Sequence, residues 1–265
     1  MICRTEGIVL RGYRMSESSK VVVLFTRAHG KIRLVAKGAR RPKSKFGASL
    51  EPMTWGNYVF YRQENRDLQT LSEGDIIYAF DGIKQVYQRL VSASAVCELL
   101  DHMTEDEDRT PMLFSVALDT LRWMESVEEH HVEFPLWYFQ LKAATVLGYR
   151  PHLSGCVHCG TRISEARVQF SPMLGGLLCK QCGNSGMVLQ KATLACMEHL
   201  QIGRAERIDV ARFRGVNRTE VNGALRAFLT HHIESRRRVR SLDFLDKMIA
   251  AEGKPAYQAE PSGGA

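Results

Sequence analysis

Four cysteines in the second half of the chain have a spacing that can hold a metal ion. They form two C-x2-C pairs separated by 19 residues, Cys156 with Cys159 and Cys179 with Cys182. Two residues between thiolates let one tight turn present both sulfurs to a metal at about 2.3 Å, and two such turns complete a tetrahedron. Four thiolates leave no open position, so we expect a structural Zn²⁺ site rather than a hydrolytic one.

A glycine follows each cysteine pair, and we expect Gly160 and Gly183 to let the backbone leave the turn with positive φ. Two redox-active pairs are the alternative, which is disfavoured because no βαβ pattern surrounds either pair. The chain has seven cysteines, an odd number, which favours metal binding or free thiols over a disulfide framework.

The second group of residues that could do chemistry is a basic stretch near the N-terminus. Nine Lys and Arg residues and no Asp or Glu lie between Glu17 and Glu51. A solvated surface usually mixes both signs, so this bias indicates a polyanionic partner, although a basic loop kept for solubility stays an alternative. We predict eight residues that contact nucleic acid: Arg27, Lys31, Arg33, Lys37, Arg40, Arg41, Lys43 and Lys45.

The charge of the whole chain is concentrated in the same region. Residues 1–80 carry 14 Lys and Arg against 7 Asp and Glu, whereas residues 81–265 carry 22 of each. The sequence has no GxxxxGK[ST] phosphate loop, no paired-carboxylate signature and no zinc-deaminase pattern. We therefore predict a binding protein that is not an enzyme.

Short strands are expected to position the basic residues. Segments 6–13, 20–26, 31–37, 54–61 and 68–80 are rich in β-branched and aromatic residues and are separated by turn-like segments. Five such strands suit a small barrel, for which we favour the oligonucleotide-binding OB-fold, and the pattern leaves an SH3-like barrel open. The aromatic residues of the fourth strand either fill the barrel or stack on bases.

The third strand and the loop after it carry most of the cations. Alternation along the strand puts Ile32, Leu34 and Ala36 on one face and Lys31, Arg33 and Lys37 on the other. We expect segment 38–50 to have too little apolar content to fold on itself, and to stay mobile until phosphates neutralise it.

The apolar period changes from two to 3.6 after residue 81, which predicts helices. We expect one long helix over 82–104, others that begin at Thr110-Pro111, near Pro135 and at Asn217, and one over 191–202. Short strands at 168–171 and 175–178, between the cysteine pairs, would form a ribbon.

The expected fold class is thus α+β. An OB-fold, DNA-binding barrel (1–80) precedes an all-helical domain (81–251) with an inserted zinc ribbon (152–187), and residues 252–265 form a disordered tail rich in Gly, Pro and Ser. No apolar run approaches the roughly 20 residues that span a bilayer, and the N-terminus lacks a signal-peptide pattern. We expect a cytoplasmic protein without a membrane partner.

This order of parts resembles the RecO family of bacterial recombination mediators. The resemblance rests on Gly7-Ile8-Val9-Leu10, Glu17-Ser18-Ser19, Thr26, Gly30, Ala36-Lys37-Gly38-Ala39-Arg40-Arg41, Ser44 and the two cysteine pairs. It covers almost the whole length, and the stretch from Lys37 to Arg41 and the cysteine pairs are its most specific parts.

Several expectations follow from the resemblance. It implies binding of single- and double-stranded DNA, annealing of complementary strands, and a place near the bacterial nucleoid. It also implies a complex with RecR that helps RecA displace the single-strand binding protein, whose acidic C-terminal tail would be a further partner. The alternative from another class is a zinc-ribbon factor that binds structured RNA or ribosomes through the same barrel. An architectural module without affinity for nucleic acid is a third.

Overall fold

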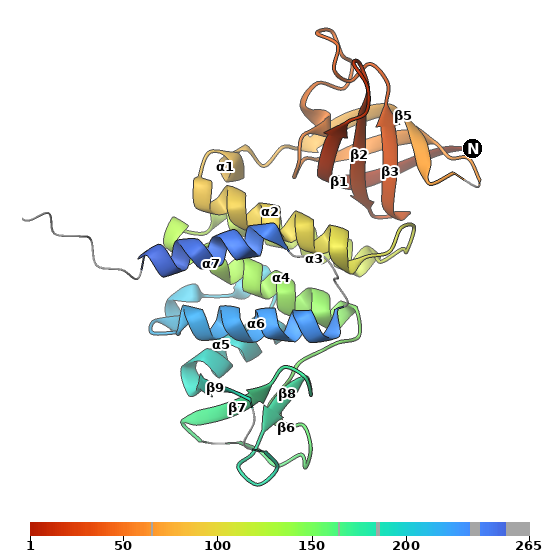
Figure 1. Ribbon diagram of the computed structural model, residues 1–265. Coiled ribbons are helices and arrows are strands. Elements are labelled where there is room, and N and C mark those ends of the chain that lie inside the picture. Colours follow the sequence, from red (N-terminus) through yellow and green to blue (C-terminus); the bar gives the residue numbers. More distant parts are fainter. Residues whose placement is uncertain (65, 164, 184–185, 234–238, 253–265) are drawn as a thin grey trace, which may run out of the picture.

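The computed structural model describes residues 1–64, 66–163, 165–183, 186–233 and 239–252. It consists of a barrel, a helical body and a small ribbon that follow one another along the molecule, with the body between the other two (Figure 1). No helix in the described ranges is long and apolar enough to cross a membrane.

Five strands close the N-terminal barrel. These are β1 (Ile2–Arg14), β2 (Lys20–Thr26), β3 (Gly30–Ala36), β4 (Trp55–Tyr61) and β5 (Leu68–Tyr78). Their order is β1-β2-β3-β5-β4, β1 closes the barrel by pairing with both β2 and β4, and β3 runs parallel to β5. This is the five-stranded Greek-key barrel of the OB-fold, so the expected fold class is confirmed.

Alternation along the strands fills the barrel as the sequence predicts. Ile32, Leu34 and Ala36 of β3 belong to the barrel core. On β4 the inward residues are Tyr58 and Phe60, both almost completely buried, whereas Tyr61 points outward and is 47% exposed.

Helices form the middle of the molecule. They are α1 (Asp81–Lys84), α2 (Tyr87–Met103), α3 (Pro111–Ser126), α4 (Glu133–Val146), α5 (Lys191–Ile202), α6 (Arg218–His232) and α7 (Arg240–Glu252). Short 3₁₀ turns lie between them: η2 (Glu129–His131), η3 (Ala205–Arg207) and η4 (Val210–Phe213). Most residues of α4 are buried. This helix contacts α2, α3, α5 and α6 and so lies at the centre of the body.

The prediction of a single helix over 82–104 is wrong, because two helices, α1 and α2, occupy this segment. Val86 adopts an extended conformation (φ −115°, ψ 119°) and separates α1 from α2. Periodicity does not reveal the break, because Ile83 before it and Leu90 after it both pack on the same core.

Helix starts agree better with the sequence. Pro111 occupies the first turn of α3, and the Asn217 side chain accepts a hydrogen bond from the Glu220 main-chain N–H at the start of α6. The last helix, α7, was not predicted separately. The expected tail, 252–265, lies outside the described residues after Glu252.

The ribbon is a four-stranded sheet at the far end of the body from the barrel (Figure 1). Its strands are β6 (His152–Cys156), β7 (Arg167–Ser171), β8 (Gly176–Leu178) and β9 (Met187–Gln190), in the order β6-β8-β7-β9. The two short strands expected between the cysteine pairs are therefore present. Phe170 and Leu177 continue into the core of the helical body.

Candidate nucleic-acid interface and metal centre

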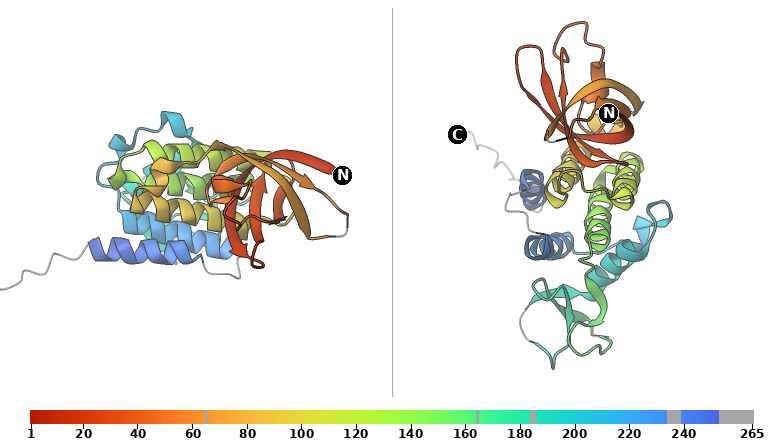
Figure 2. Two further views of the ribbon diagram at one scale, coloured as in Figure 1. Left: turned by 90° about the horizontal axis from the view of Figure 1, so that it is seen from above. Right: turned by 90° about the vertical axis from the view of Figure 1, so that its right-hand side faces the viewer.

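The loop after β3 presents a group of exposed cations. Its exposed basic residues are Lys37, Arg40, Arg41, Lys43 and Lys45. The loop projects from the end of the barrel that faces away from the helices (Figures 1 and 2). Residues 18–50 contain no Asp or Glu, so the positive field of this loop is not neutralised from within the segment.

Arg40 joins this loop to the turn between β1 and β2. Its Nη1 donates to the main-chain oxygens of Ser16 and Glu17, each at 2.9 Å, and its own main-chain N–H donates to Ser18 O at 3.1 Å. The two loops therefore form one surface, which we call the barrel tip (residues 14–19 and 37–45). Arg14 is exposed at the end of β1 and adds a cation to it.

Sequence reasoning missed Arg14 because it precedes the acid-free stretch. The signal that could have found it is the hairpin register, which sets Arg14 opposite Lys20.

The second half of the loop is more structured than its composition suggests. Phe46 and Leu50 are buried in the barrel core, the latter at the end of a 3₁₀ turn, η1 (Gly47–Leu50). The Tyr58 hydroxyl donates to Ser49 O at 2.7 Å and Lys20 Nζ donates to Leu50 O at 2.9 Å. The expectation that segment 38–50 cannot fold on itself is thus wrong for residues 46–50, because two apolar side chains suffice to anchor them.

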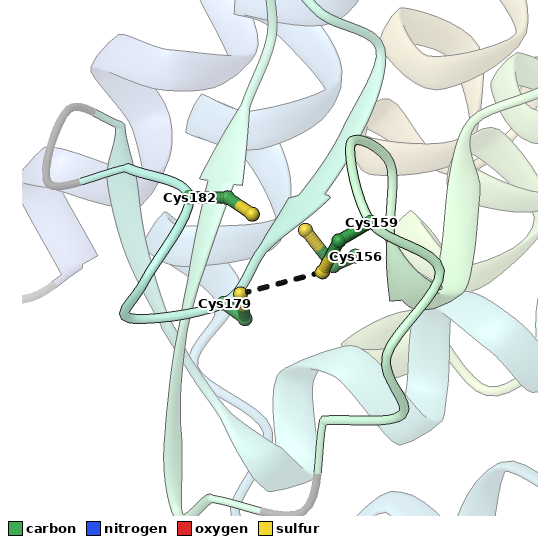
Figure 3. A group of neighbouring side chains, drawn as sticks. All are labelled: Cys156, Cys159, Cys179 and Cys182. Atoms are coloured by element: carbon green, nitrogen blue, oxygen red, sulfur yellow. Dashed lines mark hydrogen bonds between the residues drawn. The ribbon is translucent and has the colours of Figure 1, made fainter.

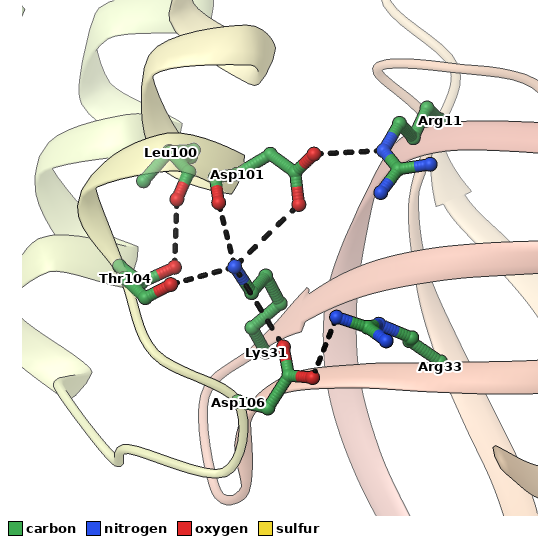
Figure 4. Close-up of polar contacts among 7 residues, drawn as sticks. All are labelled: Arg11, Lys31, Arg33, Leu100, Asp101, Thr104 and Asp106. Atoms are coloured by element: carbon green, nitrogen blue, oxygen red, sulfur yellow. Dashed lines mark hydrogen bonds and ion pairs between the residues drawn. The ribbon is translucent and has the colours of Figure 1, made fainter. Parts of the chain in front are cut away.

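Strand alternation predicts that Lys31 faces solvent, but this side chain is covered. Its side chain is 8% exposed and its Nζ donates to the main-chain oxygens of Asp101 and Thr104, each at 2.6 Å (Figure 4). The carboxylates of Asp101 and Asp106 lie 3.5 and 3.7 Å from the same ammonium. The outward face of β3 is covered here by the end of α2 and the connection to α3.

Arg33 and Arg27 are also engaged within the chain. Arg33 pairs with Asp106 at 2.9 Å beside Lys31 (Figure 4). Arg27 pairs with Glu6 at 3.2 Å, and its guanidinium lies 4.8 Å from the centre of the Phe114 ring on α3. These three predicted DNA contacts lie at the junction of barrel and body, apart from the five in the loop.

The covered face is the one that OB-folds commonly use for oligonucleotides, on the second and third strands. Val23 and Phe25 of β2 pack into the core of the helical body. On the fourth strand, Tyr58 and Phe60 are inside and Trp55 lies against Arg122, at 5.1 Å from its guanidinium carbon, which leaves Tyr61 as the exposed aromatic residue of that strand. The exposed cations of the tip are therefore the best candidate for a phosphate-binding surface.

The four predicted metal ligands converge at the tip of the ribbon. Cys156, Cys159, Cys179 and Cys182 point toward one another (Figure 3), and their sulfurs all lie within 4.8 Å of each other. Cys159 Sγ lies 3.7 Å from Cys179 Sγ. This donor set could hold one metal ion in tetrahedral coordination.

Each pair lies in a tight turn. Gly160 N–H donates to Cys156 O at 2.9 Å, and Cys182 N–H donates to Cys179 O at 3.2 Å. Gly160 has the expected positive φ, 74°. The same expectation is wrong for Gly183, whose φ is not positive; there the lack of a side chain leaves room for Leu178, whose Cδ1 would lie 3.0 Å from an added Cβ.

The electrostatics of the cluster suit a cation. Main-chain N–H groups of Cys179 and Cys159 stabilise the Cys156 thiolate and lower its pKa to about 6. In contrast, hydrogen bonds with the Cys159 and Cys179 side chains raise the pKa of Cys182 to about 12. Four adjacent sulfurs cannot all be ionised without a compensating charge, and a divalent metal supplies it.

Comparison with known proteins agrees with the architecture. The family "Recombination protein O N terminal" matches residues 1–80 and "Recombination protein O C terminal" matches residues 84–241. A curated relative from Symbiobacterium thermophilum, called DNA repair protein RecO, is 33% identical over 252 residues, 93% of this chain and 97% of the relative. One of the same name from Halalkalibacterium halodurans is 39% identical over 182 residues, 69% of each chain.

The matches thus cover the barrel, the helical body and the ribbon, and the resemblance found in the sequence is confirmed: the chain belongs to the RecO (recombination protein O) family.

Proposed function

We propose that this protein is a DNA-repair mediator that holds DNA by its phosphates at the barrel tip. The observation that carries the proposal is the set of exposed cations in residues 37–45, on a loop fixed to the β1–β2 turn by Arg40. Family membership and the relatives' common name, DNA repair protein RecO, support it. Single- and double-stranded DNA are both ligands, since each offers the same phosphates.

Annealing of complementary strands follows from the same charges. Two strands repel each other, and a cationic surface lowers that repulsion without occupying the base edges. No nucleotide hydrolysis is required, and we infer that the protein has no enzymatic turnover.

The cysteine cluster would bind Zn²⁺ in a structural role. All four positions would be filled by Cys156, Cys159, Cys179 and Cys182, so the metal would hold the two ribbon turns together. The remaining partners are inferred from the family resemblance alone. With RecR, the protein would help RecA load onto DNA that the single-strand binding protein covers, in the bacterial cytoplasm near the nucleoid, and would also contact the C-terminal tail of that protein.

The decisive experiment measures oligonucleotide affinity as a function of salt. A triple variant, Arg41→Ala/Lys43→Ala/Lys45→Ala, removes three exposed cations of the tip. Each lost phosphate contact flattens the log-affinity slope by about 0.7 for single strands, so the expected change is about 2. Fluorescence anisotropy with a labelled oligonucleotide reports it, and fluorescence transfer between complementary strands reports annealing.

A matched variant controls for net charge. Arg204, Arg207 and Arg212 are exposed on the helical body, and their replacement by alanine removes the same formal charge away from the tip. Equal slopes for the tip variant and the unaltered protein at every salt concentration would refute the proposed surface. Tighter binding to duplex RNA than to single-stranded DNA would instead favour an RNA- or ribosome-binding factor.

A further inference from the structure

The connection between α3 and α4 brings together three side chains of the kinds that bind metals. Glu128 precedes η2, and His130 and His131 end it. Glu128 Oε2 lies 3.2 Å from His130 Nε2 and 3.8 Å from His131 Nδ1, and the three donor atoms are all within 4.8 Å of one another. Ligands about 2.1 Å from a tetrahedral metal are separated by about 3.4 Å, so the carboxylate is already at a suitable distance from both imidazoles.

One of these donors has no other use among the described residues. His131 Nδ1 is buried and makes no hydrogen bond within the described part of the chain. Buried polar atoms are nearly always satisfied, and a bound ion is one of the explanations for an exception. Glu128 Oε2 lies 3.8 Å from it, too far for a hydrogen bond but a separation that two ligands of one metal ion can have.

The surrounding structure holds the donors in place. The main-chain N–H of His131 donates to the main-chain oxygen of Glu128 at 2.9 Å, which closes the turn. The His131 ring contacts the Phe134 ring edge-on, with ring centroids 5.6 Å apart. Arg218 of α6 donates to His130 O at 2.6 Å. Its positive charge is compensated by Glu133, at 2.8 Å. The turn is therefore fixed before any ligand arrives, which lowers the entropic cost of binding.

We propose that Glu128, His130 and His131 form a second metal site, separate from the four cysteines, for a divalent transition metal of the zinc, cobalt and nickel class. Imidazole with a carboxylate suits these metals, whereas Mg²⁺ and Ca²⁺ prefer oxygen ligands. Three protein ligands leave a fourth position for water or an external donor. Because Glu128 and His130 are 74% and 66% exposed, this site is open to solvent, unlike a cluster that four protein sulfurs complete.

Calorimetric titration of the full chain with Zn²⁺ tests the proposal. Protein that already holds one equivalent at the cysteines is expected to take up a second. His130→Ala and Glu128→Gln should each weaken the second event by at least about tenfold, since even loss of an outer-shell partner costs about 10- to 100-fold. His130 is the better target than His131, whose ring packs on Phe134.

The control is His231→Ala, which removes an exposed histidine from the end of α6 outside the cluster. It should bind the second equivalent as the unaltered protein does. Failure of the unaltered protein to take up a second equivalent, or unchanged uptake by His130→Ala, would overturn the proposed site.

Discussion

Lys31 fixes the barrel to the helical body through a nearly buried ammonium group. Two main-chain oxygens accept its hydrogen bonds, and two carboxylates lie within 4 Å. An ammonium removed from water is tolerated only when its donors are used and its charge is balanced, and this environment does both.

Replacement of Lys31 by methionine is expected to cost about 3–5 kcal/mol of stability, because it leaves the main-chain oxygens of Asp101 and Thr104 without their donor and removes the ammonium beside Asp101 Oδ1. Arg11 remains paired with Asp101 Oδ2, at 2.7 Å. Urea denaturation followed by circular dichroism measures the loss. The matched control is Arg33→Ala, where a 43%-exposed guanidinium should contribute only about 0–1 kcal/mol. A variant Lys31→Met as stable as the unaltered protein would contradict this account.

The pKa of Cys156 predicts how the metal-free cluster reacts. With a pKa of about 6, this thiol is mainly thiolate at neutral pH and becomes protonated below pH 6. Alkylation of Cys156 by iodoacetamide should therefore fall as the pH drops through 6, rather than near the ordinary value of about 8.5.

Peptide mapping by mass spectrometry resolves Cys156 from the other thiols. Cys196 is the internal control, because burial raises its pKa to about 12, so its alkylation should not change near pH 6. Cys156 is buried as well, so the readout is the pH at which its alkylation changes and not its absolute rate. An inflection for Cys156 above pH 8 would show that the main-chain N–H groups do not stabilise its thiolate.

The four clustered cysteines could be predicted from sequence because their chemistry is local. Two C-x2-C turns define four sulfur donors without knowledge of the fold. Only the distance between the two turns had to come from the structure. The basic residues were harder to assign. Strand alternation correctly separated Lys31 and Arg33 from the barrel interior, but it contains no information on a second domain, which covers that outward face.

At the scale of elements, the ribbon has two sources of stability. The cysteine cluster joins the turns that follow β6 and β8, and Phe170 and Leu177 belong to the core of the helical body. Phe170 also contacts Phe228 of α6, with ring centroids 6.3 Å apart. A metal held by the cysteines would tie the two turns together, while the apolar contacts attach β7 and β8 to the helices.

Removal of the metal by a chelator should loosen the two cysteine turns and leave the helices folded. Hydrogen exchange is expected to accelerate at residues 156–161 and 179–183, while α4, at the centre of the body, keeps its protection. Loss of protection throughout the helices would mean instead that the metal supports the whole body. Zinc added back should restore the slow exchange of the turns.

Most elements could be predicted because their signals are strong and short in range. The strand predicted over 20–26 coincides with β2, and the helix predicted over 191–202 coincides with α5. The helix break at Val86 could not be predicted, because the apolar spacing continues through it. Burial of Phe46 escaped because one aromatic residue in a basic loop is too little pattern to count.

At the scale of the whole molecule, barrel and helical body share one core. Ile8, Leu10, Val23 and Phe25 of the barrel belong to the same buried cluster as residues of α2, α3 and α4. Gly30 also approaches the body closely, since a Cβ there would lie 2.2 Å from Asp108 O. The division at residue 80 drawn from the sequence marks a change of secondary structure, and the packing across it is continuous.

A fragment of residues 1–80 should consequently be less stable than the barrel in the full chain. Separation exposes Val23 and Phe25, and full burial of such a side chain is worth about 1.5–3 kcal/mol. We expect a lower denaturation midpoint and a tendency to associate, measured by thermal unfolding and by light scattering. A monomeric fragment that unfolds at the temperature of the full chain would show that the shared core contributes little.

The blocked face of the barrel limits how a strand can lie. With β2 and β3 facing the helices, nucleotides cannot spread their rings across the usual OB-fold platform, and the tip offers charge in place of flat surfaces. A strand bound there by its phosphates would keep its Watson–Crick edges exposed to solvent, where a complementary strand could pair with them.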